Sequence, residues 1–359
     1  MLHLRNSTSG LAPSSANLQQ GQLAINTADA TLWTINSSGV VKKIGDANFL
    51  SKSYVQTING AAPTTAGDVW VTTKRNKLIN GRFRVNQRGF PAAGAVAGFV
   101  ADRWYAFSNG ATFSQGTATT GPDLWYLVWA ETSGTGTPYI QQSVNDVSTL
   151  SGGVTTISFY ANPSKTMTLT PSITQNFGTS GSTAVTTTGT AITLTAGVWT
   201  RYTQNITLPS ISGKTVGVNN YLKVQLSCAA APGTFTLNLT EIQWENGPNF
   251  MGYEFEDLAE TTNRCLFYYE SIASSLCWSG QLSDGTQPNM FAPYSYKRVN
   301  NPALGYANVT VSNITSGNPT LLFQSYQGAK LQLPAGNVLL GAFAYYNFDM
   351  TVNAELPVT

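Results

Sequence analysis

Residues 156–177 read TISFYANPSKTMTLTPSITQNF, and residues 221–245 read YLKVQLSCAAAPGTFTLNLTEIQWE. Both pieces alternate Thr or another polar residue with Ile, Val, Leu or an aromatic residue at a period near two, which is typical of strands with one buried face. Such runs recur about every ten residues from 76 to 256, broken by Gly, Pro, Ser and Asn, with no helical period between them. This spacing predicts an antiparallel jelly-roll β-sandwich over residues 76–256.

The composition of the whole chain fits a folded, mainly β protein. Its 359 residues include 33 Gly and 16 Pro, which punctuate short strands and turns, and 42% are hydrophobic. Only 10% are charged, against roughly a quarter in a typical soluble domain. The polar surface must therefore come mainly from Ser, Thr, Asn and Gln, which suits a robust extracellular or virion structure.

Residues 1–50 are predicted to form a separate small module. Two strand-like pieces, QLAINTA (22–28) and ATLWTIN (30–36), precede a turn and VVKKI (40–44), which predicts a β-meander. A piece of this size buries too little surface to be stable alone, so we expect it to self-associate or to dock on a partner.

Residues 51–75 are predicted to be a stalk between this meander and the sandwich. The stretch holds short β runs separated by Asn59-Gly60 and by residues 66–68, and Asn-Gly favours tight turns between strands. A flexible linker is the alternative interpretation.

The pattern changes at residue 257, where a helix is predicted to begin. Asp257 can cap its start, and Glu260 can complete a capping box. Apolar residues recur at helical spacing through about residue 273, and short strand patterns return after Trp278. Residues 257–359 are therefore expected to form one helix and a second β-module.

Residue counts exclude several classes of function. A net charge of +2, from 19 basic and 17 acidic residues, offers no footprint for a phosphate backbone, so no nucleic-acid partner is expected. The single histidine, His3, argues against His-based catalysis and His metal sites. We expect the three cysteines, an odd number without CxxC spacing, to be buried thiols. They are Cys228, Cys265 and Cys277.

No targeting or membrane-spanning segment is expected. Residues 1–15 lack an apolar stretch of signal-peptide length, and no run of about 18 apolar residues follows. We therefore expect synthesis in the cytoplasm and no membrane insertion.

Acidic residues are too sparse along the predicted sandwich for carbohydrate cleavage. Glycoside hydrolysis needs two carboxyl groups about 5–10 Å apart, and no Asp or Glu occurs between Asp146 and Glu241. The remaining cluster lies at the predicted helix start, where capping and the helix dipole explain it. Its members are Glu254, Glu256, Asp257 and Glu260. We predict no catalytic residue and no cofactor.

Aromatic residues are the most suggestive functional feature. Sugars expose C–H faces that stack on aromatic rings, while nearby polar groups bind the hydroxyls. Alternation in DLWYLVW (123–129) places Trp125 and Tyr126 on opposite faces of one strand, so one faces the core and the other could contact a sugar. Packing in the core or at a subunit interface is the alternative, and it is the role expected of Trp104. The candidates for sugar contact, the last three in or near loop-like segments, are Trp125, Tyr126, Trp278, Tyr294 and Tyr296.

The order of four segments resembles bacteriophage tail-fibre and related virion-appendage proteins with a jelly-roll domain similar to carbohydrate-binding modules. The first looks like the N-terminal module of such fibres, with Gln22 in place of the usual acidic residue, and the last two look like the ends of the jelly roll. The segments are LQQGQLAINTADATLWTINSSGVVKKIG (18–45), TINGAAPTTAGDVWV (57–71), NKLINGRFRVNQRGF (76–90) and IQWENGPNFMGYEFEDLAETTNRCLFYYES (242–271).

By this resemblance the chain would be a homotrimeric, non-enzymatic fibre of the virion that binds a bacterial surface polysaccharide for host attachment. Its N-terminal module would bind other virion proteins, in the tail, the baseplate or the capsid. The residues expected at that contact are Leu23, Ile25, Leu32 and Trp33. A capsid or head fibre with an accessory adhesion role is the alternative, and a polysaccharide depolymerase is a further one.

The resemblance also bears on metal binding. Jelly-roll carbohydrate modules hold Ca²⁺ through carboxylate and backbone oxygens. Here Arg82 stands at the position of the usual acidic residue after the first Asn-Gly, which leaves Glu241 as the main candidate ligand. We therefore predict no metal site.

Overall fold

The computed structural model describes residues 4–6, 8, 10–45, 74–119, 121–281, 288–312, 314, 316–334 and 343–357. The chain divides into two compact units, Met1–Thr73 and Lys74–Thr359. The predicted stalk, 51–75, lies outside the described residues except for Lys74 and Arg75. Strands dominate both units, which confirms the mainly β fold class.

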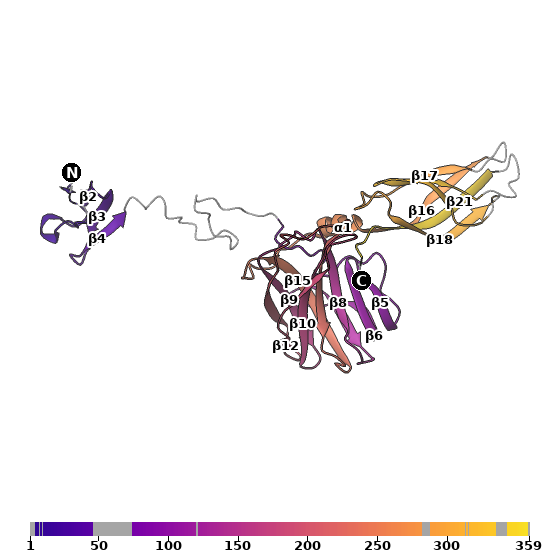
Figure 1. Cartoon of the computed structure of the whole chain (residues 1–359), viewed down its shortest axis with the longest axis horizontal. Helices are drawn as coiled ribbons and strands as arrows, with labels where there is room; N and C mark the ends of the chain where they lie inside the picture. The colour runs from indigo at the N-terminus through magenta and orange to yellow at the C-terminus, as the bar shows by residue number, and fades with distance from the viewer. Residues whose placement is uncertain are drawn as a thin grey trace. The chain divides into compact units, whose positions relative to one another are not determined.

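The first unit is a small four-stranded sheet (indigo in Figure 1). Its elements are β1 Leu4–Asn6, the 3-10 helix η1 Ser15–Asn17, β2 Leu23–Asn26, β3 Thr31–Ile35 and β4 Val41–Gly45. Strands β2, β3 and β4 form the predicted antiparallel meander, and β1 joins β2 in parallel. Its core consists of Leu18, Ala24 and Ile35, with Trp33 packed against them.

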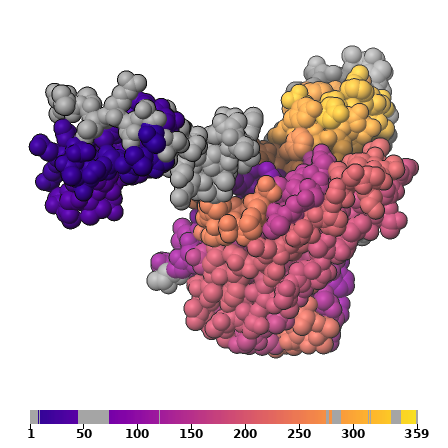
Figure 2. Space-filling view, turned by 60° about the vertical axis from the view of Figure 1, so that its left-hand side comes forward, coloured from indigo at the N-terminus to yellow at the C-terminus, as the bar shows by residue number. Residues whose placement is uncertain are grey.

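The second unit contains the predicted β-sandwich. Its strands are β5 Gly94–Ala101, β6 Trp104–Thr117, β7 Trp125–Glu131, β8 Tyr139–Asn145, β9 Val154–Pro163, β10 Met167–Asn176, β11 Val185–Thr188, β12 Ile192–Leu194, β13 Thr200–Thr207, β14 Tyr221–Cys228 and β15 Phe235–Asn246. Hydrogen bonds link them in the order β11-β10-β14-β8-β6-β7-β15-β9-β13, with β5 on β6 and β12 on β10. Figure 2 shows the stretch from β10 to β14 (rose) over much of the visible surface of the sandwich.

The long strand β6 belongs to both layers of the sandwich. Residues 105–107 pair with β8, whereas residues 111–117 pair with β7. We call the layer of β5, the first half of β6, β8, β14, β10 and β11 the front sheet, and the layer of the second half of β6, β7, β15, β9 and β13 the back sheet. The core between them includes Trp104, Trp129 and Trp244, which confirms the core role predicted for Trp104.

The helix begins as predicted but ends early. In α1, Leu258–Leu266, the Asp257 carboxylate accepts a 2.7 Å hydrogen bond from the Glu260 backbone N–H. The predicted end near residue 273 is wrong, because the backbone from Tyr269 onward pairs with a C-terminal strand instead. Burial of Cys265 and Tyr268 among Ile79, Val85 and Tyr221 fixes the helix at one end of the sandwich.

The C-terminal module is the expected second β-module, and its described strands form two three-stranded sheets. One sheet has the order β16-β21-β18 and the other the order β17-β20-β19. The strands are β16 Tyr269–Gln281, β17 Asn289–Pro293, β18 Ala303–Ser312, β19 Thr320–Gln324, β20 Gly328–Gln332 and β21 Phe343–Asn353. Tyr346, Phe348 and Met350 of the central strand are buried between the sheets.

Candidate functional site

The outer face of the front sheet carries a group of aromatic side chains. The register pairs Phe99 with Tyr105, and it pairs Phe107 with Tyr139. The alternate residues Ala106 and Ile140 are fully buried in the core, so the aromatic rings lie on the outer side. We name this group the aromatic face, and it consists of Phe99, Tyr105, Phe107 and Tyr139.

The rings of the aromatic face contact one another in pairs. The ring centroids of Phe99 and Tyr105 lie 5.7 Å apart, edge to face, and those of Phe107 and Tyr139 lie 5.5 Å apart, stacked. Phe107 keeps 36% of its surface exposed, and the other three are half-buried. Burial raises the pKa of Tyr139, so its hydroxyl remains a hydrogen-bond donor at neutral pH.

Polar side chains border the aromatic face. In the register, Gln141 lies between Tyr105 and Gln225, and Ser227 lies opposite Tyr139. Gln141 is buried, whereas Gln225 and Ser227 are half-buried and share a 2.7 Å hydrogen bond from Nε2 to Oγ. Rings beside an amide and a hydroxyl can bind a sugar, because the rings stack on its C–H faces and the polar groups form hydrogen bonds with its hydroxyls.

The C-terminal segment closes one end of the aromatic face. The shallow pocket at this end is lined by Phe99, Arg103, Tyr105, Gln141, Ser143, Glu355 and Leu356. Arg103 forms an ion pair with Glu355 and donates to the carbonyl oxygen of Ser143. Its guanidinium carbon lies 3.4 Å from the ring centre of Tyr268. Burial lowers the pKa of Arg103 to about 10, so it stays charged at neutral pH and holds this end closed.

A second aromatic pair belongs to the other layer. Tyr126 contacts Trp199 with ring centroids 5.3 Å apart, edge to face, and its ring lies directly over Gly116, where a Cβ would collide with it. Trp125 is half-buried at the start of β7, and the next residue on its side of the strand, Leu127, is fully buried. The predicted candidates Trp125 and Tyr126 thus belong to the back sheet, away from the aromatic face.

The candidates in the C-terminal module have few open ring faces. Trp278 is half-buried against the module's core, and Tyr294 is 6% exposed, with its hydroxyl donating to the Ser325 carbonyl oxygen at 2.7 Å. Tyr296 is 51% exposed, but its ring is stacked on Phe267 at 6.2 Å and on Tyr326 at 5.1 Å. Its edge and hydroxyl are therefore the parts available to a ligand.

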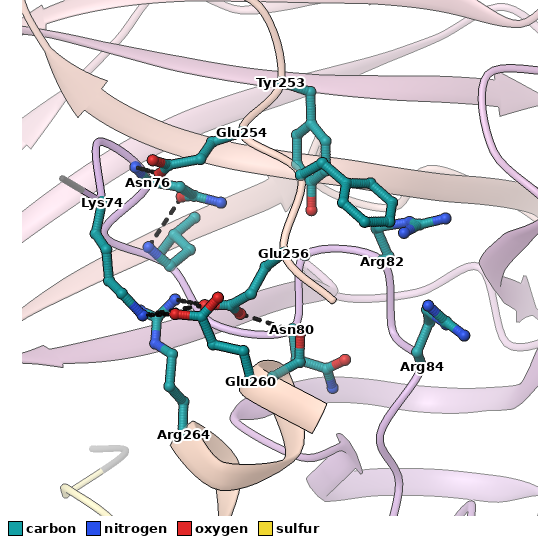
Figure 3. A pocket seen from close by; sticks show the side chains of 14 residues that line it. Lys74, Asn76, Asn80, Arg82, Arg84, Tyr253, Glu254, Glu256, Glu260 and Arg264 are labelled. Carbon is teal, nitrogen blue, oxygen red and sulfur yellow. Dashed lines mark hydrogen bonds and ion pairs between the residues drawn. The ribbon is translucent and has the colours of Figure 1, made fainter. Parts of the chain in front are cut away.

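Three members of the acidic cluster, Glu254, Glu256 and Glu260, line a pocket of about 100 Å³ between residues 74–84 and 253–264 (Figure 3). Glu256 is 2.6 Å from Arg264 and 3.7 Å from Lys74, which also forms an ion pair with Glu260. Glu254 accepts a 2.7 Å hydrogen bond from the Asn76 backbone N–H. These contacts, together with the cap at Asp257, tie the first residues of this unit, 74–76, to the start of the helix. They support the structural interpretation of the cluster.

Guanidinium groups face the carboxylates around Arg82 and Glu241, the positions that bear on a calcium site. Arg82 forms a two-pronged ion pair with Asp123, and Arg201 pairs with Glu241 while its guanidinium carbon lies 4.2 Å from the Tyr160 ring centre. Burial raises the pKa of Glu241, and Arg201 opposes that rise. Within the described residues, no group of three or more His, Cys, Asp or Glu is placed to hold a metal ion.

Three of the four expected attachment residues gather on one face of the N-terminal sheet. The register pairs Leu23 with Thr34 and Ile25 with Leu32, on the side opposite the Ala24–Trp33 pair and the small core. Ile25 is 40% exposed, and Leu23 and Leu32 are half-buried. Trp33 packs against the core instead.

The cysteines depart in part from expectation. Cys228 and Cys265 are buried thiols, and burial raises the pKa of Cys228 to about 12. Cys277 is exposed, so the prediction of three buried thiols is wrong for this residue. It lies on β16, which stands at the edge of its sheet beside β21.

Sequence reasoning missed the aromatic face. A signal exists in DRWYAF (102–107), where Trp104 and Ala106 alternate with Tyr105 and Phe107, so that one set must point outward. What the sequence lacks is the register that places β8 beside β6 and thus Tyr139 beside Phe107.

Comparisons with known proteins assign no family. No protein-family model matches the chain, and no curated protein matches it. No helix in the described part of the chain has the length and apolar character to cross a membrane.

Solved structures overlap the chain over less than half its length. A cellulose-binding domain of a Cellulomonas fimi glucanase is 16% identical, covering 41% of this chain and 90% of its own, with a TM-score of 0.30. A xylan-binding domain from Paenibacillus barcinonensis is 15% identical, covering 43% and 98%, with a TM-score of 0.30. A family 22 carbohydrate-binding module from Clostridium thermocellum is 16% identical, covering 46% and 99%, with a TM-score of 0.31.

Proposed function

We propose that this protein is a non-catalytic glycan-binding protein that holds a polysaccharide on its aromatic face. One observation carries the proposal: four rings lie together on the outer side of the front sheet, beside the Gln225 amide and with Phe107 exposed to solvent. Stacking on such rings is worth about 0.5–1.5 kcal/mol per pair beyond the buried area.

The absence of catalysis is part of the proposal. The carboxylates of the acidic cluster are held by Lys74, Arg264 and the Asn76 backbone, and those beside Arg82 and Arg201 are held by guanidinium groups. A general acid and a nucleophile need carboxyl groups free to face a sugar, which these are not.

We further propose that the chain is a bacteriophage fibre that attaches the virion to a host polysaccharide. The order of the fibre-like segments in the sequence supports this role, and the apolar face of Leu23, Ile25 and Leu32 supports attachment of the N-terminal unit to another virion protein. A homotrimer would provide three aromatic faces on one particle appendage, and such multivalency raises the overall strength of binding.

The glycan-binding proposal is tested by affinity electrophoresis of the full chain against a panel of bacterial surface polysaccharides. The double variant Phe107→Ala with Tyr139→Ala should lose at least about tenfold in affinity for the polysaccharides that retard the native chain. Tyr126→Ala is the matched control, because it removes a ring from the back sheet. Unchanged binding by the folded double variant would overturn the assignment, and a loss in Tyr126→Ala alone would move the site to the back sheet.

The virion role is tested by labelling intact particles with an antibody to this chain and imaging them by electron microscopy. Label at the tail or baseplate is the expected result. Label on the capsid would replace the tail-fibre role with that of a head fibre, and no label on particles would contradict both.

A further inference from the structure

Cations near the aromatic face include Arg88 and Arg103, which both pair with Glu355, and Lys223. Lys223 is on β14 and points to the same side as Gln225 and Ser227, since side chains two residues apart share a face. In the register it lies between Ser143 of β8 and Thr174 of β10.

Lys223 has no partner among the residues that the structure describes. It is half-buried, and neither a hydrogen bond nor an ion pair joins it to any residue that the structure describes. Burial lowers its pKa, and no neighbouring carboxylate acts against that shift. A charge held partly out of water without a counter-ion is unfavourable, so an anion brought by a ligand would be stabilised there.

The surrounding strands offer Lys223 no carboxylate. None of β5, β6, β8, β10, β11 and β14 contains an Asp or Glu. Asp146, which follows β8, accepts hydrogen bonds from Ser148 instead.

Other buried cations of the same unit are treated differently. Lys297 is fully buried, and its ammonium is 2.6 Å from the Glu270 carboxylate. Arg103 is likewise paired with Glu355. Lys223 therefore differs from these two cations in having no counter-ion among the described residues.

We propose that the aromatic face binds an anionic glycan, with Lys223 holding the acidic group of one sugar unit while neighbouring units stack on the rings. This inference rests on the proposed function and adds the class of polysaccharide. Strands lie about 4.8 Å apart and residues about 3.4 Å apart along them, which puts Lys223 on the order of 12 Å from Tyr105. The ligand must therefore be an oligosaccharide and not a single sugar.

The probes are hexasaccharides of galacturonic, glucuronic and mannuronic acid, each compared with the neutral hexasaccharide of the parent sugar by calorimetry on the full chain. We expect at least one acidic member to bind about tenfold to a hundredfold more tightly than its neutral partner, because a charge-assisted hydrogen bond is stronger than a neutral one. Sulfated hexasaccharides are measured as a third set of ligands. Their affinity shows whether the chain prefers a sulfate or a carboxylate as the acidic group.

The variant Lys223→Met should remove this preference and leave the affinity for neutral hexasaccharides unchanged, and Lys223→Arg should keep the preference. Lys214→Met, at an exposed lysine in the loop before β14, is the control for loss of one positive charge. Because Lys223 is unpaired, its replacement by Met should not lower the unfolding midpoint, which shows that the variant folds.

Two results would overturn the inference. Equal affinity for acidic and neutral members would contradict it while leaving glycan binding intact, and so would a preference that survives Lys223→Met. Binding to no hexasaccharide or bacterial polysaccharide in either set would contradict the proposed function itself, and this inference with it.

Discussion

The front and back sheets of the sandwich both hold rings beside charged side chains, but they differ in whether every charge and ring has a partner. On the back sheet, Arg201 pairs with Glu241 and lies against the rings of Tyr160 and Phe250. On the front sheet Arg88, which pairs with Glu355, also lies over the ring of Phe99, whereas Phe107 is stacked only on Tyr139 and Lys223 has no counter-ion among the described residues. Similar residues therefore stabilise the fold where they satisfy each other, and they are available to a ligand where they do not.

The largest expected effect is a loss of stability when a buried ion pair is broken. Asp123→Ala removes the partner of Arg82, whose side chain is 15% exposed, and breaking a buried pair costs about 3–5 kcal/mol. We expect a fall of that size in the free energy of unfolding, measured by denaturant titration, with polysaccharide affinity unchanged below the transition. The double variant Asp123→Ala with Arg82→Met should recover part of the loss. A fall below about 1 kcal/mol would contradict a stabilising role for the pair.

The next largest loss of stability is expected at Gly116, where the ring of Tyr126 lies close to the backbone of the back sheet. A Cβ at Gly116 would collide with the Tyr126 ring, and overpacking of this kind costs about 1–3 kcal/mol. Gly116→Ala should lower the thermal midpoint, and combining it with Tyr126→Ala should restore most of it. If Gly116→Ala is as stable as the native chain, the Tyr126 ring does not lie over Gly116.

A single ring on the front sheet should affect binding and not folding. Tyr105→Ala removes one member of the Phe99–Tyr105 pair, and we expect a loss of about twofold to tenfold in polysaccharide affinity. Tyr126→Ala should change affinity by less than twofold. Equal losses in the two variants would remove the distinction between the sheets.

The smallest effect is the dependence of stability on pH. Burial raises the pKa of Glu241 and of Asp102 above the ordinary values of about 4. The stability linked to such groups is complete below the unfolded pKa and is lost as pH rises through the higher folded pKa. The free energy of unfolding should therefore increase slightly as pH falls from 7 toward 5, and Glu241→Gln should flatten the curve. A decrease over the same range would contradict the assignment.

Much of the fold could be predicted from the sequence, because alternation of apolar and polar residues reports burial directly. The strands over 156–162, 167–177 and 221–228 and the cap at Asp257 are found where the pattern indicated. The end of the helix could not be predicted, because Tyr269 pairs with Asn353, and that contact outweighs the local helical spacing.

The candidate site was harder to predict for the same reason. Phe107 and Tyr139 are 32 positions apart and meet only through the order of strands in the sheet. Trp125 was a candidate for sugar contact because it belongs to an aromatic run. Local sequence alone, however, does not distinguish a ring that points into the core from one that points outward. Lys223 looks ordinary in sequence, and its lack of a partner is visible only once the neighbouring strands are known.

The most direct test of glycan binding on the aromatic face is hydroxyl-radical footprinting of the full chain with and without a bound polysaccharide, read residue by residue by mass spectrometry. We expect protection of Phe99, Tyr105, Phe107 and Tyr139 on binding, with oxidation of Tyr126 and Trp199 unchanged. Protection of Tyr126 and Trp199 with the four rings of the aromatic face still oxidised would contradict glycan binding on that face.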